Sequence, residues 1–430
     1  MNKKTLVVGL AGYGVVGTGF ARALEENREL IRRRTGCDIV IKTVVAKESE
    51  NELAHPLPKG AVLSHDIDTI CTDPEIDLGI ELMGGTGIAA KFLRKCLENG
   101  KHAVTANKAL LAEDGLDLFR IAGEKNLYLG YEASVCGGIP IVQAMREGLA
   151  GNRILSLSGI LNGTCNYILS AMTAKGQSFT DALKDAQRLG FAEADPTLDI
   201  EGLDAAHKLV LLIRLAWGAE YPFKSLPVRG ISKVGAEDIG FARELGYRIK
   251  LLGQARLADG KIEAGVFPTL VHESSMLAKV DGSFNAVWAK GNAVGTVFMH
   301  GRGAGDLPTG SAVLSDVMAV ARGAVPNNTG FVAQEPQKAD LLCPSQAESK
   351  HYFRLMVPDR PGVLRDVAGI LAENGMSIAQ AIQKGEEEIV PLVFMTHLAK
   401  AQSVENAIKT LRDRDLLRAE PVSYRVLAHE

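Results

Sequence analysis

Over the first 135 residues, the spacing of apolar positions alternates between the two-residue period of a strand and the three-to-four-residue period of a helix. β-Branched runs predict strands at 5–11, 39–48, 78–82 and 102–106, and a last helix–strand unit covers 118–135. Amphipathic segments between these runs predict helices, the first of which ends near Arg34. Strands that alternate with helices indicate an α/β domain with a doubly wound parallel sheet.

The pattern changes at about residue 136, where helices and alternating strands follow without regular order. Helices are expected at 140–149, 163–174, 179–189 and 200–217, and strands at 153–160, 227–231, 247–257, 262–268, 285–289 and 293–299. This order is typical of an α+β domain, which we place at 136–305. The glycine-rich turn GRGAGDLPTGSAV then leads into a helix over about 306–322, which we expect to complete the first domain.

The C-terminal part of the chain contains a polar segment and a small module. Residues 324–350 are polar and contain three prolines, which predicts a linker. Residues 351–427 then show the order strand–helix–strand–strand–helix–strand. This βαββαβ order indicates a ferredoxin-like domain. We therefore expect three domains, at 1–135, 136–305 and 351–427.

The bulk composition excludes several classes of protein. A chain of 430 residues, of which 46% are hydrophobic, is long enough for two or three globular domains. Its net charge of −3 argues against a broad basic surface for nucleic acid or anionic lipid. Six scattered cysteines without a CxxC pair fit reduced thiols in the cytoplasm. The N-terminus resembles a secretory signal, but five glycines interrupt it, and no run reaches the ~20 apolar residues of a membrane span.

The turn after the first predicted strand has the clearest chemical signature. It reads Gly12-Tyr13-Gly14-Val15-Val16-Gly17 and opens a helix. The glycines of a GxGxxG turn let the backbone approach a pyrophosphate, which the helix N-terminus stabilises. A purely structural glycine turn is the alternative, but the strand–turn–helix context favours an NAD(P)-binding Rossmann domain over 1–135.

The end of the second predicted strand bears on which dinucleotide is bound. NAD sites usually place an acidic residue here, on the ribose 2′-hydroxyl. In this chain Ala46 is followed by Lys47 and Glu48. A cation favours the 2′-phosphate of NADP, whereas Glu48 leaves NAD open, and Lys47 can equally be a solvated surface residue.

Two lysines stand where a ligand cleft is expected. Lys108 follows the strand at 102–106, and the carboxyl ends of parallel strands face the ligand crevice, although a surface lysine is the commoner case. Lys208 lies one helical turn after Asp204, at the start of the apolar run LVLLIRLAWG. Burial lowers the pKa of a lysine and suits it to proton transfer, while a neighbouring Asp204 raises it. A structural Asp–Lys pair is the alternative.

An acidic cluster surrounds the approach to Lys208. Its five carboxylates are Glu193, Asp195, Asp199, Glu201 and Asp204. They suit a cationic ligand such as the ammonium group of an amino acid. They are also typical of the first turn of a helix, where acidic residues act as caps and favour the helix dipole.

These segments together resemble homoserine dehydrogenase over about residues 5–320. The resemblance rests on seven blocks in order: GYGVVG, ELMGGT, GKHAVTANKALL, YEASVCGGIPI, GILNGTCNYIL, GFAEADPTLDIEGLDAAHK and GRGAGDLPTGSAV. The tail, with PDRPGVLRDVAGILAENG, is similar to an ACT domain, a module that commonly binds amino acids. The resemblance implies NAD(P)-dependent interconversion of L-aspartate 4-semialdehyde and L-homoserine. Some family members with such a tail are feedback-inhibited by threonine, which we expect here, with another amino acid or no effector as the alternatives.

The resemblance also implies roles for the lysines and acids. Lys208 matches the acid/base, and Lys108 matches a second lysine at the junction of cofactor and substrate. Glu193 and Asp204 match the acids that bind the substrate, with Asp199 in support. Glu193 is a candidate contact of the cofactor as well. Residues 136–305 then form the catalytic and dimerisation domain.

Two further sets of residues follow from the same resemblance. Gly190 and Gly305 match backbone positions that approach the cofactor, and Thr86 is a further candidate contact. A monovalent cation, usually sodium, is expected at the side chain of Glu132 and the backbone carbonyls of Val135, Gly137 and Ile139. Hard oxygen ligands of this kind suit a hard cation.

The chain departs from the family pattern at four positions. Arg302 stands where proline is usual, and Cys136 where glycine is common. Cys165 replaces a threonine, and Gly310 replaces an alanine. None of these changes removes a predicted catalytic group. Arg302 is placed where it can approach the cofactor phosphates.

Two other functions fit parts of the sequence. A phosphoglycerate dehydrogenase with an ACT tail requires a His–carboxylate relay, but His207 points off the helix face of Lys208 by about 100°. A catalytically inactive amino-acid sensor on the same fold is the second alternative, and retention of both predicted lysines argues against it. The apolar strands of the middle domain suggest a homodimer, and paired ACT domains would make a homotetramer.

Overall fold

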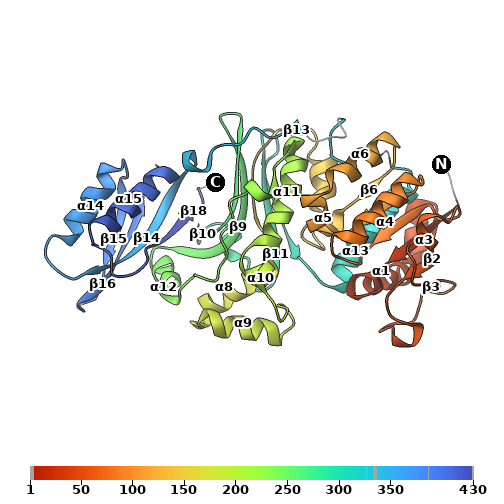
Figure 1. The fold of residues 1–430 in the computed structure, drawn as a ribbon, viewed down its shortest axis with the longest axis horizontal. Coiled ribbons are helices and arrows are strands. Elements are labelled where there is room, and N and C mark those ends of the chain that lie inside the picture. Colours follow the sequence, from red (N-terminus) through yellow and green to blue (C-terminus); the bar gives the residue numbers. More distant parts are fainter. Residues whose placement is uncertain (1–3, 325, 327, 333–336, 386, 429–430) are drawn as a thin grey trace.

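Three structural regions follow one another along the molecule, from right to left in Figure 1. The computed structural model describes residues 4–324, 326, 328–332, 337–385 and 387–428. The first region is built on a six-stranded sheet, whereas the second and third share one large sheet. No helix in this described part of the chain is long and apolar enough to cross a bilayer. All six cysteines are free, as their scattered spacing predicts.

The first region is a parallel sheet with helices between its strands. Its strand order is β3-β2-β1-β4-β5-β6, and neighbouring strands pair in parallel. The strands are β1 (Thr5–Ala11), β2 (Asp38–Val45), β3 (Val62–Ser64), β4 (Leu78–Glu81), β5 (His102–Thr105) and β6 (Leu129–Gly130). The helices are α1 (Val15–Glu26), α2 (Arg28–Thr35), α3 (Asp68–Cys71), α4 (Gly87–Glu98), α5 (Lys108–Glu113) and α6 (Leu116–Glu124). The predicted doubly wound sheet is confirmed, and its order reverses between β1 and β4, where such sheets bind ligands.

The first predicted helix is in fact two helices. Asn27 separates α1 from α2, and its side-chain amide donates to the carbonyl of Ala23 at 2.9 Å. Asparagine competes for backbone hydrogen bonds in this way and therefore favours helix ends. A hydrophobic period that continues across such a break does not reveal it.

Helix α13 (Asp306–Ala321) comes from late in the sequence and packs on α1. Glycine makes this close packing possible on both helices. A Cβ on Gly19 would lie 2.2 Å from the carbonyl oxygen of Asp306, and one on Gly310 would lie 2.5 Å from the backbone nitrogen of Phe20. This close approach explains glycine at position 310, where the family resemblance led us to expect alanine.

The second region contains long antiparallel strands and the helices of the candidate site. The strand order is β12-β11-β7-β9-β10. The strands are β7 (Ile154–Ile160), β9 (Tyr247–Ala258), β10 (Lys261–His272), β11 (Phe284–Gly291) and β12 (Gly295–Arg302). The helices are α7 (Ile141–Gln143), which continues as a π-helical turn (Ala144–Gly148), α8 (Gly163–Lys175), α9 (Phe179–Arg188), α10 (Thr197–Ile200), α11 (Leu203–Trp217) and α12 (Ala236–Glu244). This mixed region is the predicted α+β fold.

Two predicted elements of this region differ from the structure. The strand expected at 227–231 is a single bridge between Val228 and Val266. The helix expected at 200–217 divides at Gly202, whose φ of +83° separates α10 from α11. Glycine is the residue that adopts this left-handed conformation without steric cost. A glycine inside an apolar helical pattern thus marked a helix boundary.

The third region has the ferredoxin-like order predicted from the sequence. Its elements are β14 (Glu348–Pro358), α14 (Val363–Glu373), β15 (Ile378–Gln383), β16 (Ile389–Thr396), β17 (Ala399–Lys400), α15 (Ala401–Asp413) and β18 (Val422–Val426). Its sheet continues the sheet of the second region, because β18 pairs in parallel with β10. Figure 1 shows β18 and β10 at this junction.

The described part of segment 324–350, predicted as a linker, contacts the body of the protein. Asn328 is fully buried; its side chain accepts from the backbone nitrogen of Leu129 at 2.8 Å and donates to the carbonyl of Leu127 at 2.9 Å. Strand β13 (Gln337–Lys338) pairs with β8 (Ala219–Glu220). A polar residue of this segment can therefore form buried hydrogen bonds with backbone groups of the first region, and not only face solvent. Residues 325, 327 and 333–336 of this segment lie outside the described residues.

A buried charge cluster joins the second region to the third. Asp238 on α12 is fully buried. Its carboxylate accepts from Nε and Nη2 of Arg354 at 2.7 and 3.0 Å, and from the hydroxyl of Tyr352 at 3.0 Å. Both partners lie on β14. Because this bidentate pair is removed from solvent, loss of one partner leaves the other charge uncompensated.

We expect Asp238→Asn to lower the free energy of unfolding by about 3 kcal/mol, because Arg354 then stays buried without its counter-charge. The midpoint of urea unfolding measures this change. Glu237→Gln is the matched control: Glu237 contacts the same arginine at 3.2 Å, but its side chain is 68% exposed. The control should shift stability by less than about 0.5 kcal/mol. Equal effects of the two substitutions would show that the buried pair does not stabilise this junction.

Candidate active site

The GxGxxG turn lies between β1 and α1, next to the point where the sheet order reverses. Gly12 has a φ of +101°, and a Cβ there would lie 2.5 Å from the carbonyl group of Leu82. A Cβ on Gly17 would lie 2.2 Å from the carbonyl oxygen of Gly12. At Gly14, in contrast, no heavy atom lies within 4 Å of the Cβ position, and the next residue, Val15, is 69% exposed. The N-terminus of α1 is therefore open to an anionic group.

The other predicted cofactor contacts are distributed around this turn. Tyr13 turns its side chain away, and its hydroxyl donates to the carbonyl of Pro56 at 2.8 Å. Val16 lines the cavity described below. Lys47 is exposed just beyond the carboxyl end of β2, and Thr86 is exposed at the N-cap of α4. Backbone groups of the turn are thus free to meet a ligand, Lys47 is exposed at the end of β2, and the Tyr13 hydroxyl is engaged elsewhere.

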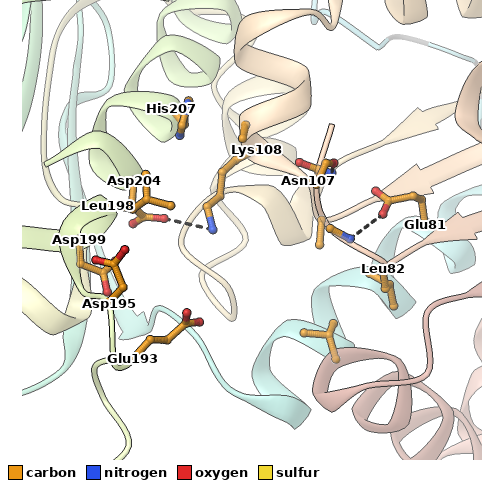
Figure 2. A pocket seen from close by; sticks show the side chains of 15 residues that line it. Glu81, Leu82, Asn107, Lys108, Glu193, Asp195, Leu198, Asp199, Asp204 and His207 are labelled. Atoms are coloured by element: carbon orange, nitrogen blue, oxygen red, sulfur yellow. Dashed lines mark hydrogen bonds and ion pairs between the residues drawn. The ribbon is translucent and has the colours of Figure 1, made fainter. Parts of the chain in front are cut away.

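A cavity of about 380 Å³ lies between the first and second regions. Figure 2 shows acidic side chains on one side of it and Lys108, Asn107 and Glu81 on the other. Four of the five predicted acids line it, namely Glu193, Asp195, Asp199 and Asp204. The cavity therefore has an acidic wall from the second region and faces the carboxyl ends of β4 and β5.

Asp204 stands between the two predicted lysines. Its Oδ2 accepts from Nζ of Lys208 at 2.6 Å, and its Oδ1 lies 3.1 Å from Nζ of Lys108, the contact drawn in Figure 2. Lys208 is buried, and its Nζ also donates to the carbonyl of Leu161 at 2.7 Å. The side chain of Lys108 is 39% exposed and faces the cavity. One carboxylate thus joins a lysine held in the core to a lysine at the cavity.

Asn162 supports two acids of this wall. It is buried at the N-cap of α8, where its Oδ1 accepts from the backbone nitrogen of Cys165 at 2.8 Å. Its Nδ2 donates to Asp199 Oδ1 at 2.7 Å and to Asp204 Oδ2 at 2.9 Å. The thiol of Cys165 donates to the carbonyl of Asp199 at 3.1 Å. Cysteine at this position thus supplies the donor that a threonine hydroxyl would supply.

The pKa of Lys208 is raised above its ordinary value. Burial is the largest single effect and favours the neutral amine, but the charge of Asp204 and its hydrogen bond, together with other nearby groups, outweigh burial. The pKa of Asp204 is correspondingly held well below its usual range, because Lys208 and Lys108 outweigh the effect of burial on this carboxyl. Burial and the charge of Asp204 raise the pKa of Asp199. Both opposing effects that the sequence predicts for Lys208 are therefore present, and their net result keeps its ammonium charged.

Three further predicted contacts lie on loops, and of these Glu193 lines the cavity. Gly190 follows α9 with a φ of +76°, and no heavy atom lies within 4 Å of its Cβ position. Gly305, with a φ of +125°, is the N-cap of α13. Glu193 is exposed, and Figure 2 shows its carboxylate turned toward the cavity. The structure thus brings Glu193 to the same cavity as Asp204, but not into contact with it.

Glu132, predicted to hold a cation, is buried and hydrogen-bonded. Its two carboxylate oxygens accept from the backbone nitrogens of Val142 at 2.9 Å and Gln143 at 2.8 Å. Burial and the nearby charge of Asp316 raise the pKa of Glu132 to about 7. A bound cation would compensate this buried charge, so the side chain fits the predicted site.

The loop after Glu132 presents backbone carbonyls. Cys136 and Gly137 both have a positive φ, +57° and +50°. Glycine adopts this conformation without cost and cysteine does not, which explains why glycine is the commoner residue at position 136. Among the described residues, none donates to the carbonyls of Val135 and Gly137, whereas that of Ile139 accepts from the nitrogen of Ile141 at 2.7 Å. Two of the three predicted carbonyl ligands are therefore open.

Comparison with known proteins identifies the family. Family models match three parts of the chain: "Homoserine dehydrogenase, NAD binding domain" at 12–132, "Homoserine dehydrogenase" at 140–318, and "ACT domain" at 351–415. A homoserine dehydrogenase of Neisseria gonorrhoeae is 43% identical over 421 residues, which cover 96% of both chains. The chain belongs to the homoserine dehydrogenase family.

Solved structures agree with this assignment. The crystal structure of a homoserine dehydrogenase from Thiobacillus denitrificans has a TM-score of 0.93 at 41% identity and covers 99% of both chains. A hyperthermophilic archaeal homoserine dehydrogenase in complex with NADPH shares the fold, with a TM-score of 0.61 at 24% identity over 73% of this chain and 97% of that one. The chain is an NAD(P)-dependent oxidoreductase of this family. The alternatives of a phosphoglycerate dehydrogenase and of an inactive sensor find no support in these comparisons.

Three polar residues of this site were not among the predicted site residues: Asn162, His207, which the sequence analysis set aside, and Glu81. Asn162 bridges two acids, and its position before a predicted helix was an available N-cap signal. His207 lines the cavity, and its Nε2 lies 2.7 Å from Oε1 of Glu113. Glu81 is fully buried, and its carboxylate accepts from the backbone nitrogen of Gly84 and from the hydroxyl of Thr105. For His207 and Glu81, no local pattern indicated the partner.

We expect Asp204→Asn to leave Lys208 buried without its counter-charge and to lower the free energy of unfolding by about 3 kcal/mol at neutral pH. Burial then lowers the pKa of Lys208 below the ~10.4 of an unfolded chain. Between these two values the unfolded chain binds more protons, so the variant gains stability as pH rises. The parent protein does not, because its Lys208 pKa is raised.

Urea unfolding measured at a series of pH values between about 7 and 10 tests this expectation. Asp195→Asn is the matched control, because Asp195 is exposed and its carboxylate accepts from the Thr197 hydroxyl at 2.6 Å without contacting a lysine. If the two variants showed the same pH dependence, Asp204 would not be the group that keeps Lys208 charged.

Proposed function

We propose that this chain reduces L-aspartate 4-semialdehyde to L-homoserine, reversibly, with NADPH as the hydride donor. The observation that carries the proposal is the meeting of Lys108 and Lys208 at Asp204, beside an open dinucleotide turn. Reduction of an aldehyde needs a hydride, which a bound nicotinamide supplies, and a proton, which the protein must deliver. This reaction belongs to the biosynthesis of threonine, methionine and isoleucine from aspartate.

Lys208 is the proposed proton donor. Its ammonium is charged at neutral pH, because Asp204 raises its pKa. As the aldehyde carbon is reduced, negative charge develops on its oxygen, and an ammonium beside that oxygen both stabilises the charge and transfers a proton. Lys108, which faces the cavity, supplies a second positive charge next to the reacting group.

Glu193 and Asp204 are the proposed ligands of the substrate's ammonium group, with Asp199 in support. All three line the cavity, and the pKa of Asp204 keeps it ionised at neutral pH. Lys108 already contacts Oδ1 of Asp204 at 3.1 Å. An ammonium that binds this oxygen therefore competes with Lys108 and releases it toward the substrate.

NADP is the proposed cofactor, and NAD is the alternative. Lys47 is exposed where a 2′-phosphate is held in sheets of this topology, and the open N-terminus of α1 suits the pyrophosphate. The related archaeal enzyme solved with NADPH supports the same choice. Thr86, Gly190, Glu193 and Gly305 are further proposed contacts of the cofactor. Sodium is proposed at Glu132 and the carbonyls of Val135, Gly137 and Ile139.

Regulation and assembly complete the proposal. Residues 1–135 and α13 bind the cofactor, 136–305 bind the substrate and dimerise, 324–350 link the regions, and 351–427 regulate. Threonine is the proposed effector of the ACT domain, which fits an amino-acid ligand. We propose a homodimer or homotetramer located in the cytoplasm.

Replacement of the proton donor tests the proposal most directly. Lys208→Ala is expected to lower kcat for homoserine oxidation by about 10³-fold, because the alkoxide loses its acid/base. The Kd for NADPH should change by less than about twofold, since Lys208 contacts Asp204 and the carbonyl of Leu161 and not the dinucleotide turn. Steady-state assays with NADP and with NAD, each with and without threonine, measure turnover and inhibition. Lys91→Ala, an exposed lysine of α4, is the control. Unchanged turnover in Lys208→Ala would refute the assignment.

The cofactor assignment makes a separate prediction for Lys47. Lys47→Glu is expected to lower the ratio of kcat/KM for NADP to kcat/KM for NAD by about 10-fold to 100-fold, because a charged hydrogen bond to the 2′-phosphate becomes a repulsion. Lys59→Glu makes the same charge change at another exposed position of the first region and should leave this ratio unaltered. If both variants lowered this ratio equally, Lys47 would not be the residue that binds the 2′-phosphate.

A further inference from the structure

Helices α5 and α11 meet at the cavity and carry the two lysines. Helix α5 begins at Lys108 and ends at Glu113, and α11 carries Asp204, His207 and Lys208. Two contacts of opposite polarity join these helices: Lys108 Nζ lies 3.1 Å from Asp204 Oδ1, and His207 Nε2 lies 2.7 Å from Glu113 Oε1. Because α5 belongs to the first region and α11 to the second, the two contacts also join the regions.

His207 is held in one orientation. It is 6% exposed, and its ring stacks on Phe223 with the centroids 4.3 Å apart and the planes 13° from parallel. Its Nε2 is fixed by Glu113, whose side chain is 41% exposed. Figure 2 shows His207 on the same helix as Asp204, near the base of the Lys108 side chain. An imidazole fixed by a ring on its face and by a carboxylate at its edge keeps the two helices at one separation.

The two contacts differ in what substrate binding does to them. In the function proposed above, the substrate ammonium binds Asp204 and competes with Lys108 for Oδ1. The contact between Lys108 and Asp204 is therefore weakened at the stage when Lys108 has to act on the substrate. The contact between His207 and Glu113 involves neither Asp204 nor a lysine, so it persists. Arg214 adds a longer hydrogen bond, from Nη1 to the carbonyl of Leu111 at 3.2 Å.

We propose that His207 and Glu113 are positioning residues for Lys108. They hold α5 against α11 so that Lys108 remains at the cavity after the substrate has taken its place on Asp204. This inference rests on the proposed function and extends it to two residues outside the predicted site. A reacting group that moves by about 1 Å can cost about 100-fold in rate, so a small shift of α5 is sufficient to matter.

The test compares His207→Ala, Glu113→Ala and the double variant with the parent. Each single variant is expected to lower kcat for homoserine oxidation by about tenfold. The double variant should be no worse than either single variant, because the two residues act as one unit. His207→Gln retains a side-chain N–H for Glu113 and should recover most of kcat. Glu124→Ala is the matched control: Glu124 pairs with Arg120 at 2.8 Å on α6, away from the cavity.

Four further readouts separate positioning from a loss of stability. The kinetic isotope effect with homoserine deuterated at C4, the carbon that gives up the hydride, should rise toward its intrinsic value, because hydride transfer becomes slower relative to product release. The KM for cofactor and the Kd for NADPH, measured by fluorescence, should stay within about twofold. The thermal midpoint of Glu113→Ala should match that of Glu124→Ala.

The possible results are distinct. Additive losses in the double variant, no recovery in His207→Gln, or an equal loss in Glu124→Ala would each overturn the positioning role. If the parent oxidises homoserine and the single variants match it, the positioning role fails while the proposed function stands. If the parent does not oxidise homoserine with either cofactor, the proposed function itself fails.

Discussion

The buried carboxylate of Asp204 is the constraint on which the rest of the site depends. An ammonium group inside a protein needs a partner that compensates its charge, and Asp204 is that partner for Lys208 at 2.6 Å. The same carboxylate accepts from Asn162 and contacts Lys108, so it also orders the N-terminus of α8 and the start of α5. The side chain of Asp204 therefore affects three things at once: the protonation state of Lys208, the arrangement of the acidic wall, and the contact between the first and second regions.

The third region is connected to this site through a short path of packed elements. Asp238 binds Arg354 and Tyr352 on β14, and it lies on α12, which packs against α8. Asn162, the residue that holds Asp199 and Asp204, is the N-cap of helix α8. One intervening helix thus separates the ACT sheet from the element that positions the acids. The third region and the acidic wall are therefore linked through packed elements and a buried ion pair.

Much of the fold could be predicted because it depends on local signals. The GxGxxG turn, the alternation of strands and helices and the βαββαβ tail each lie within short stretches of sequence. The contacts that complete the site are not local: His207 and Glu113 are 94 residues apart, and Asn162 meets Asp204 across 42 residues. Composition does not distinguish an asparagine in a solvated linker from one that is buried and hydrogen-bonded. For this reason the linker prediction did not reveal the burial of Asn328. The pKa of Lys208 depends on the distance between its Nζ and the carboxylate of Asp204. The sequence indicated burial and this carboxylate as opposing effects, but not that distance.

Strand β10 has its outer edge covered in sections by segments from distant parts of the chain. Val228 pairs at Val266, Leu341 pairs at Ile262, and β18 pairs at Thr269 and Leu270. An uncovered edge would offer a row of unpaired N–H and C=O groups to other chains, which is a known route to aggregation. The tail and the segment before it therefore act as a protective edge for the catalytic sheet, whatever ligand the ACT domain binds. Removal of the third region would therefore do more than remove the ACT domain, because it would also expose the edge of β10 at Thr269 and Leu270.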